Sequence, residues 1–233
     1  MIKISILIPV YNEEDTIISL LKSVQKEISK IKTVNFEIIV IDDCSNDSTS
    51  KLLRENETLY NHVISLEKNQ GKGGAILQGL EKAKGEFILF QDADLEYSPK
   101  DYKALIRPIV DFDVDVVIGS RFLAPQFTRV HYFWHKVGNW GLTLIFNILN
   151  NTTFTDIYCC YLIYRKSLVP LENIKTIGWE QHGEILSLAI KKGEVFFEVP
   201  ITYRGRSYHE GKKIRGFHIF KILYTITMTR FFT

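Results

Sequence analysis

The chain has 233 residues, of which 45% are hydrophobic and 24% are charged, and this composition excludes disorder and collagen-like repeats. Its 29 Lys and Arg residues against 27 Asp and Glu residues give a net charge of +2, which excludes a general nucleic-acid binder with a wholly basic surface. A chain of this length buries enough apolar surface to be stable without disulfides or a structural metal, so we expect one large domain, with or without an appendage.

Short β-branched runs alternate with helical patterns from residue 2 to about residue 119, which predicts βαβ units and a mainly parallel sheet. The predicted strands are residues 2–9, 36–41, 62–66, 86–91 and 114–119. After the first strand, apolar residues recur at helical spacing and predict a helix that packs one stripe on the sheet: Ile17, Leu21, Val24, Ile28 and Ile31. Ser98 and Pro99 predict the start of a later helix.

The pattern changes after Arg121. An aromatic, amphipathic segment at 130–150 precedes a predicted strand at 158–165, a helix at 180–192 and a strand at 195–200. In the last segment, four apolar residues share one helical face, which predicts an amphipathic helix: Ile219, Ile222, Leu223 and Ile226. Its polar residues are expected largely elsewhere on the helix: His218, Lys221, Thr225 and Arg230.

The cysteines and the apolar runs indicate the cellular setting. The three cysteines form no Cys-x-x-Cys pair and make a poor disulfide framework, which favours a reducing, cytosolic setting: Cys44, Cys159 and Cys160. The N-terminal run has no small-residue cleavage site and is interpreted as a strand, not a signal peptide. No stretch reaches the roughly 18 to 20 uncharged apolar residues of a membrane span, so we expect membrane contact only at the surface.

Acidic side chains follow three of the predicted strands. Glu13 follows the first strand, Asp42 and Asp43 end the second, and the fourth precedes an acidic loop: Asp92, Asp94 and Glu96. Ligands bind beyond the carboxyl ends of strands in an open parallel sheet. Asp92 and Asp94 alternate with Ala93, so both carboxylates can reach one hard divalent ion, with Glu96 near enough to supply a further oxygen. The alternative is that these residues only cap a loop and a helix.

A glycine-rich run, Gly71-Lys72-Gly73-Gly74, follows the third predicted strand. Dinucleotide-binding and P-loop enzymes place such a loop directly after the first strand, so these two classes are excluded. The run still offers backbone N–H groups, a lysine and a helix N-terminus to an anion. A plain turn that opens a helix is the alternative.

In this order and spacing, the motifs resemble the family 2 glycosyltransferases of the GT-A fold, and among them the dolichol-phosphate and polyprenyl-phosphate sugar synthases. The resemblance covers nearly the whole chain and rests on residues 8–14 (IPVYNEE), 41–49 (IDDCSNDST), 71–75 (GKGGA), 92–94 (DAD), 119–122 (GSRF) and 198–204 (EVPITYR). It implies an α/β, Rossmann-like GT-A sheet flanked by helices. Residues 1–121 would form the nucleotide-sugar-binding part, 122–215 the acceptor-side part of the same domain, and 216–233 the amphipathic C-terminal helix.

The resemblance also implies roles for individual residues. Seven residues would bind the nucleotide: Pro9, Tyr11, Glu13, Asp42, Asp43, Lys72 and Gly73. Asp92, Asp94 and Glu96 would hold Mg²⁺ or Mn²⁺ on the donor diphosphate, and the catalytic set would be Asp92, Asp94 and Arg121. A single in-line attack at the anomeric carbon would invert its configuration.

The acceptor is inferred from charge. A lipid phosphate is already anionic and needs cations, whereas a sugar hydroxyl needs a carboxylate base. A basic segment resembles the acceptor-side loop of the polyprenyl-phosphate branch and contains Arg204, Arg206, Lys212 and Lys213. The resemblance adds Arg129 and Asp156 to the expected acceptor-binding residues. We therefore expect hexose transfer from a GDP- or UDP-sugar to a polyprenyl phosphate by a cytoplasmic protein, peripheral at the membrane face, with room for a separate membrane anchor and no nucleic-acid partner.

Several alternatives stay open at this point. A hydroxyl of a surface glycan or lipid-linked oligosaccharide could be the acceptor, with Asp156 or Glu184 as the base. The chain could be a non-catalytic nucleotide-sugar-binding subunit, although the intact Asp92-Ala93-Asp94 argues against it. The basic segment could be a solvated loop. The apolar stretch at 142–149 and the C-terminal helix each fit either a membrane interface or a buried core.

Overall fold

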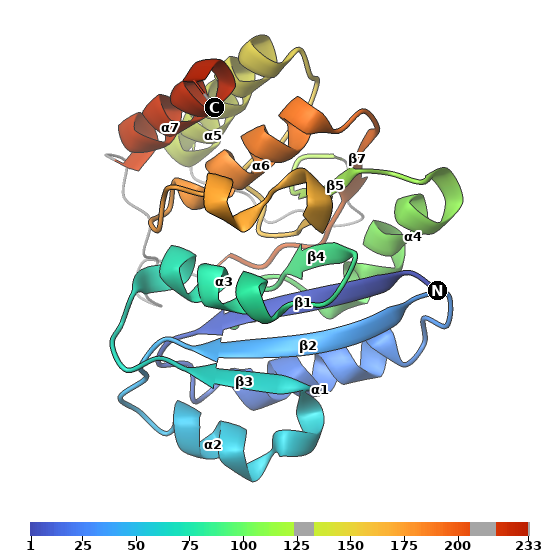
Figure 1. Ribbon diagram of the computed structural model, residues 1–233, viewed down its shortest axis with the longest axis vertical. Coiled ribbons are helices and arrows are strands. Elements are labelled where there is room, and N and C mark those ends of the chain that lie inside the picture. The colour runs from blue at the N-terminus through green and yellow to red at the C-terminus, as the bar shows by residue number, and fades with distance from the viewer. Residues whose placement is uncertain (124–132, 206–217, 233) are drawn as a thin grey trace.

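The computed structural model describes residues 1–123, 133–205 and 218–232 (Figure 1). Its strands form a seven-stranded sheet in the order β3-β2-β1-β4-β6-β5-β7. The strands are β1 (Lys3–Val10), β2 (Asn35–Asp42), β3 (His62–Ser65), β4 (Phe87–Phe90), β5 (Val116–Ser120), β6 (Leu162–Arg165) and β7 (Phe196–Pro200). The α-helices are α1 (Ile17–Ile28), α2 (Thr49–Glu55), α3 (Gly71–Lys82), α4 (Tyr102–Phe112), α5 (Phe133–Asn150), α6 (Gln181–Lys192) and α7 (His218–Phe232).

The sheet is mainly parallel, as the alternating pattern predicts. Strand β6 runs antiparallel to both of its neighbours, β4 and β5, and the other pairings are parallel. The predicted strand at 158–165 is shorter than expected and begins at Leu162. Residues 158–161 form a loop instead, and Tyr158 and Cys160 in that loop line the pocket described below.

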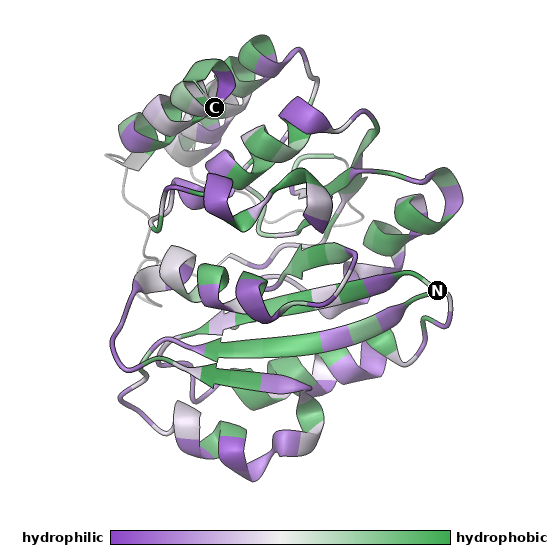
Figure 2. Cartoon of the chain, in the orientation of Figure 1, coloured by the Kyte–Doolittle hydropathy of each residue, from purple (hydrophilic) through white to green (hydrophobic). Residues whose placement is uncertain are grey.

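The centre of the sheet is buried on both faces. In β1, Ile4, Ile6, Leu7 and Ile8 have no exposed surface, and Figure 2 shows β1 and β2 as largely hydrophobic strands. A strand covered on both sides has a nearly continuous apolar sequence, as these strands do. Helix α3 packs on β1 and β2, whereas α1 lies on the opposite face of the sheet (Figure 1).

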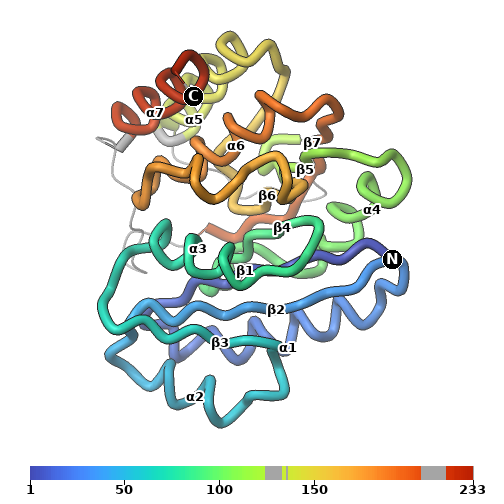
Figure 3. Tube along the Cα trace, viewed as in Figure 1, coloured from blue at the N-terminus to red at the C-terminus, as the bar shows by residue number. Residues whose placement is uncertain are grey.

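The later elements build the other half of the molecule. Figure 3 shows α5, α6 and α7 on the side of the molecule that holds β5, β6 and β7, with β2 and β3 at the opposite end. Helix α6 packs on β6, and α5 and α7 pack on each other and on α6 in an outer layer. No helix in the described part of the chain has both the length and the hydropathy needed to cross a bilayer.

The predicted C-terminal helix is confirmed as α7, but its two faces differ from the prediction. Thr225 and Thr229 lie on the buried face beside Ile222 and Ile226. The outward positions carry large hydrophobic side chains: Phe220, Tyr224, Phe231 and Phe232, with 64–77% of their surface exposed. The threonines fit the packed face because helical Ser and Thr hydroxyls can bond to the backbone one turn earlier.

Candidate functional site

A cavity of about 500 Å³ opens where β1, β2 and β4 end. It gathers most of the residues predicted for the donor site: Pro9, Tyr11, Glu13, Asp43, Lys72, Gly73, Asp92, Asp94, Glu96 and Arg121. These residues come from five separate segments, and the parallel strands bring them to one edge of the sheet. The structure therefore supports one site for the acidic and glycine-rich motifs.

The loops that form the cavity have an unusual backbone. Asn12, Cys44 and Leu95 follow β1, β2 and β4, and their φ angles are 53°, 63° and 61°. Non-glycine residues with positive φ are uncommon and concentrate at functional sites. Hydrogen bonds join the first two loops, from Asn12 N to Ser45 Oγ at 3.0 Å and from Asn46 N to Asn12 Oδ1 at 2.8 Å. The chain thus fixes these loops in one arrangement around the cavity.

Asp42 and Asp43 have different roles. Asp43 lines the cavity, and its carboxylate accepts hydrogen bonds from Gln70 N at 2.7 Å and Gly71 N at 2.8 Å, which fixes the glycine-rich loop. Burial raises the pKa of Asp43, and these two amides partly offset that rise. Asp42 does not line the cavity. It is buried and accepts hydrogen bonds from Ser45 N and Ser50 Oγ, so it braces the loop from behind, unlike its predicted role at the nucleotide.

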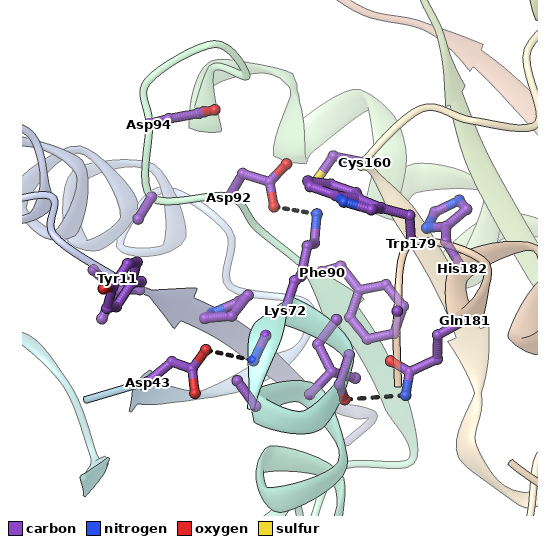
Figure 4. Close-up of a pocket in the computed structure, with 18 of the residues that line it drawn as sticks. Tyr11, Asp43, Lys72, Phe90, Asp92, Asp94, Cys160, Trp179, Gln181 and His182 are labelled. Atoms are coloured by element: carbon purple, nitrogen blue, oxygen red, sulfur yellow. Dashed lines mark hydrogen bonds and ion pairs between the residues drawn. The ribbon is translucent and has the colours of Figure 1, made fainter. Parts of the chain in front are cut away.

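Lys72 and Asp92 form an ion pair inside the cavity (Figure 4), with Nζ and Oδ1 2.5 Å apart. Burial raises the pKa of Asp92, but the charge and hydrogen bond of Lys72, with smaller effects of Cys160 and His182, together lower it overall. Burial lowers the pKa of Lys72, yet the Asp92 charge raises it overall, so both groups are charged at neutral pH.

Gly73 lies directly against the segment before α6. A Cβ atom on Gly73 would be 2.3 Å from the carbonyl oxygen of Ile177, a distance that real Cβ contacts do not reach. The side chain of Gln181 holds the same contact, because Nε2 donates to Gly73 O at 3.0 Å and to Thr176 O at 2.7 Å. The glycine is therefore required for close packing between α3 and the 176–181 segment.

Arg121 lines the cavity and is fixed by Asp156 from behind. Its Nε and Nη2 atoms donate to the two carboxylate oxygens of Asp156 at 2.6 and 2.7 Å, and Asn139 Nδ2 donates to Asp156 at 3.0 Å. Burial raises the pKa of Asp156, but Arg121 outweighs it and the pKa is lowered. The guanidinium also lies 5.2 Å from the ring centre of Tyr203.

Asp156 thus differs from its predicted contact with the acceptor. It has no exposed surface, so it positions Arg121 and does not line the cavity. Glu184 is also engaged: its carboxylate accepts hydrogen bonds from Lys175 N and Thr176 N, both at 2.9 Å. Both carboxylates considered as bases are therefore committed to holding neighbouring segments.

The donor set at the acidic loop fits a hard divalent cation. Asp92, Asp94 and Glu96 all line the cavity and offer carboxylate oxygens, the ligands that Mg²⁺ and Mn²⁺ prefer. Asp94 Oδ1 accepts a hydrogen bond from Glu96 N at 3.1 Å, and Glu96 Oε2 accepts one from Tyr203 Oη at 2.8 Å. Among the described residues, no three His, Cys, Asp or Glu side chains are gathered as a ready metal site. A bound ion would therefore need oxygens from a ligand as well.

Several residues of the cavity were missed by the sequence interpretation. Trp179, Gln181 and His182 enter from the segment before α6 and from its first turn (Figure 4). Burial, with a smaller effect of Lys72, lowers the pKa of His182 from 6.5 to about 4, so its imidazole is neutral near pH 7. Its Nε2 atom is buried and has no hydrogen-bond partner among the residues that the structure describes. The Gly178-Trp179 pair before a helix was the available signal.

The predicted acceptor residues are less defined. Arg204 is exposed and does not line the cavity. Its backbone N donates to Glu96 O at 2.9 Å, so the segment that follows β7 supports the acidic loop. Arg129, Arg206, Lys212 and Lys213 lie outside the described residues.

Comparison with known proteins agrees with this geometry. Residues 5–170 match the protein family described as "Glycosyl transferase family 2". The chain is 30% identical, over 97% of its length and 96% of the relative's, to a UDP-N-acetylglucosamine–dolichyl-phosphate N-acetylglucosaminyltransferase of Methanococcus voltae. It is 29% identical to a dolichol-phosphate mannosyltransferase of Pyrococcus furiosus, covering 95% of the chain and 64% of that protein.

Solved structures extend the comparison to the fold. Glucosyl-3-phosphoglycerate synthase from Mycobacterium tuberculosis, in complex with Mn²⁺, UDP and phosphoglyceric acid, superimposes with a TM-score of 0.68. The match is 18% identical in sequence and covers all of the chain and 80% of that structure. The seven-stranded sheet and its flanking helices therefore have the predicted GT-A fold.

Proposed function

The chain belongs to glycosyl transferase family 2, and on that premise we propose that it transfers a hexose from a nucleotide sugar to a polyprenyl phosphate. One observation supports this most: a single cavity joins the acidic loop, the glycine-rich loop and the buried Arg121. The donor would lie mainly against residues 1–121 and the acceptor against 122–215. Inversion at the anomeric carbon would follow from one in-line attack.

The donor half is supported by the charges in the cavity. Lys72, Arg121 and the N-terminus of α3 offer positive charge and backbone N–H groups to a diphosphate. Charge develops on the leaving diphosphate as the bond to the sugar breaks, and fixed cations stabilise it most in a partly dry site. Tyr11 and Asp43 lie on the side of the cavity proposed for the nucleotide base and ribose.

A divalent cation is part of this proposal. Asp92, Asp94 and Glu96 would hold Mg²⁺ or Mn²⁺, which would neutralise charge on the diphosphate. The Mn²⁺ and UDP in the synthase from Mycobacterium tuberculosis agree with this choice. The protein's own residues keep the loop in place: Tyr203 and the backbone of Arg204 both bond to Glu96.

A phosphate acceptor fits the site better than a hydroxyl acceptor. Both relatives act, by name, on dolichyl or dolichol phosphate. A hydroxyl would need a carboxylate base, and the two candidates, Asp156 and Glu184, are already bonded to Arg121 and to the 175–176 backbone. An anionic phosphate needs no base, and Arg121 offers it a fixed positive charge.

A lipid acceptor places the protein at a membrane, and the outer helices fit that location. Helices α5 and α7 contain no acidic residue, and Trp134 and Trp140 are 76% and 63% exposed. Lys136 and Arg230 supply positive charge on the same two helices, whereas Lys221 is paired with Glu180 at 2.7 Å. Exposed aromatic residues beside lysines and arginines favour an anionic bilayer surface. We place the protein at the cytoplasmic face as a peripheral protein, with a separate anchor as an optional partner.

A donor panel tests the proposed function. Purified protein is incubated with Mg²⁺ or Mn²⁺, a short-chain polyprenyl phosphate and individual GDP- or UDP-sugars, and the anomeric configuration of any product is read by NMR. One nucleotide sugar should yield a lipid-linked hexose with inverted configuration, and chelation of the metal should stop its formation. Retained configuration, or nucleotide binding without any transfer, contradicts the proposal; the latter would indicate a non-catalytic subunit.

A further inference from the structure

Asp92 is already neutralised by the protein itself. Its Oδ1 atom lies 2.5 Å from Lys72 Nζ, and the two side chains are only 22% and 29% exposed. The buried side chain of Cys160 also lies near this carboxylate in the cavity. An ion pair that is partly removed from water is screened less than one on the surface. The Lys72 ammonium group therefore stands beside Asp92 in the place that a bound metal cation would take.

A divalent cation and the Lys72 ammonium group are competitors for Asp92. Two positive charges within a few ångströms repel each other, and the repulsion doubles for a divalent ion. In the ligand-free protein, other carboxylates do not offset this repulsion, because no three metal-binding side chains are gathered among the described residues. The cation thus meets an incomplete ligand set and a resident positive charge.

The same lysine lies where a diphosphate would bind. Lys72 is in the first turn of α3, and Gly71 and Gly73 beside it also line the cavity. A lysine is a compact charge on a flexible stem, so its head group can change partner without a change in the backbone. A diphosphate at the helix N-terminus offers the nearest alternative negative charge.

We propose that Lys72 is an exchangeable counter-ion: it neutralises Asp92 in the ligand-free protein and moves to the donor diphosphate when a divalent cation binds Asp92 and Asp94. This inference rests on the proposed function, because it takes a nucleoside diphosphate group as the ligand. Cation and nucleotide then bind with positive coupling, and each increases the affinity of the other by the same factor. The protein alone holds the cation weakly.

Mn²⁺ binding, read by the electron paramagnetic resonance signal of the unbound ion, tests this exchange. Lys72→Met should bind Mn²⁺ alone at least about tenfold more tightly than the unchanged protein, because one repelling charge is gone. Addition of UDP or GDP should increase Mn²⁺ affinity less in Lys72→Met than in the unchanged protein. Lys72→Arg, which keeps the charge, and Lys68→Met, an exposed lysine of the preceding loop, should both bind Mn²⁺ as the unchanged protein does.

The outcomes separate this inference from the proposed function. The proposed exchange is wrong if Lys72→Met and the unchanged protein bind Mn²⁺ with equal affinity. It is also wrong if nucleotide increases the Mn²⁺ affinity of both proteins by the same factor. Lys72→Gln replaces Lys72→Met if thermal melting shows that the latter does not fold. If the unchanged protein binds no nucleotide with Mn²⁺ present, the donor half of the proposed function fails, while the comparison with Mn²⁺ alone still tests the counter-ion role.

Discussion

The guanidinium of Arg121 is held by the fully buried carboxylate of Asp156 through two parallel hydrogen bonds of 2.6 and 2.7 Å. Asn139 and the backbone N of Arg121 bond to the same carboxylate. A planar, bidentate pair fixes both the direction and the position of the guanidinium. Asp156 therefore fixes the Arg121 guanidinium in the cavity, so this hydrogen-bond donor does not have to be ordered when an anionic ligand binds.

Removal of Asp156 should destabilise the protein strongly. Asp156→Ala leaves the buried Arg121 charge unpaired, and the free energy of unfolding should fall by about 3 to 5 kcal/mol. The control is Asp111→Ala, which breaks the exposed Arg107–Asp111 pair and should cost less than about 1 kcal/mol. Urea unfolding measures both. If both variants lose a similar free energy of unfolding, the buried Arg121–Asp156 pair stabilises the protein no more than the exposed pair does.

The contact between Gly73 and Ile177 should tolerate no side chain. In Gly73→Ala the new Cβ would meet backbone atoms at 2.3 Å, so α3 or the 176–181 segment must move. We expect a stability loss of about 1 to 3 kcal/mol and weaker nucleotide binding by calorimetry. Gly141→Ala on α5, where a Cβ meets nothing within 4 Å, should stabilise the protein by about 0.5 to 1 kcal/mol. Wild-type nucleotide affinity in Gly73→Ala would contradict the role of this contact.

His182 should make the protein less stable in mild acid. The unfolded chain binds a proton near pH 6.5, whereas the native imidazole binds one only near pH 4. The unfolded state therefore holds more protons between these values, and the free energy of unfolding falls as the pH drops through that range. The loss assigned to this residue is roughly 2 to 3 kcal/mol.

Urea unfolding between about pH 7 and pH 4 measures this effect. His182→Gln should show a shallower decline than the unchanged protein, and His62→Gln, a substitution on the edge strand β3, should follow the unchanged protein. If the free energy of unfolding falls equally with pH in His182→Gln and in the unchanged protein, His182 is not the cause of the decline.

The outer helices should bind anionic membranes. Replacement of both Trp134 and Trp140 by Ser should reduce co-sedimentation with vesicles that contain phosphatidylglycerol by at least about fivefold, because exposed aromatic surface drives interfacial binding. Phe112→Ala removes an aromatic side chain that is 58% exposed on α4, away from these helices, and should bind as before. Equal loss in both variants, or strong binding to neutral vesicles alone, contradicts the assigned surface.

The sequence predicted which strand ends meet at the cavity, because strand ends are readable from local patterns. Alternating apolar runs located β1, β2 and β4, and parallel pairing then brings their carboxyl ends together. The sequence did not show which of two adjacent aspartates, Asp42 or Asp43, lines the cavity. That depends on how the chain turns after β2, where Cys44 has a positive φ.

The part of the cavity built after residue 121 was less predictable because it depends on contacts between distant segments. Asp156 is an acidic residue after an apolar helix in the sequence, and only the fold shows that it lies behind Arg121. His182 enters the cavity because α6 packs on β6, the antiparallel strand. Periodicity describes one element at a time and contains no information on such pairings.

The most direct test of the central claim compares two acceptors of the same chain length, a polyprenyl phosphate and the corresponding polyprenol. The protein is assayed with Mn²⁺ and the nucleotide sugar identified by the donor panel, and Asp94→Asn serves as the control. We predict a hexosyl lipid only from the phosphate, with a rate at least about a hundredfold lower in Asp94→Asn. Glycosylation of the polyprenol, or of a glycan in preference to the phosphate, would contradict the account and indicate a hydroxyl acceptor.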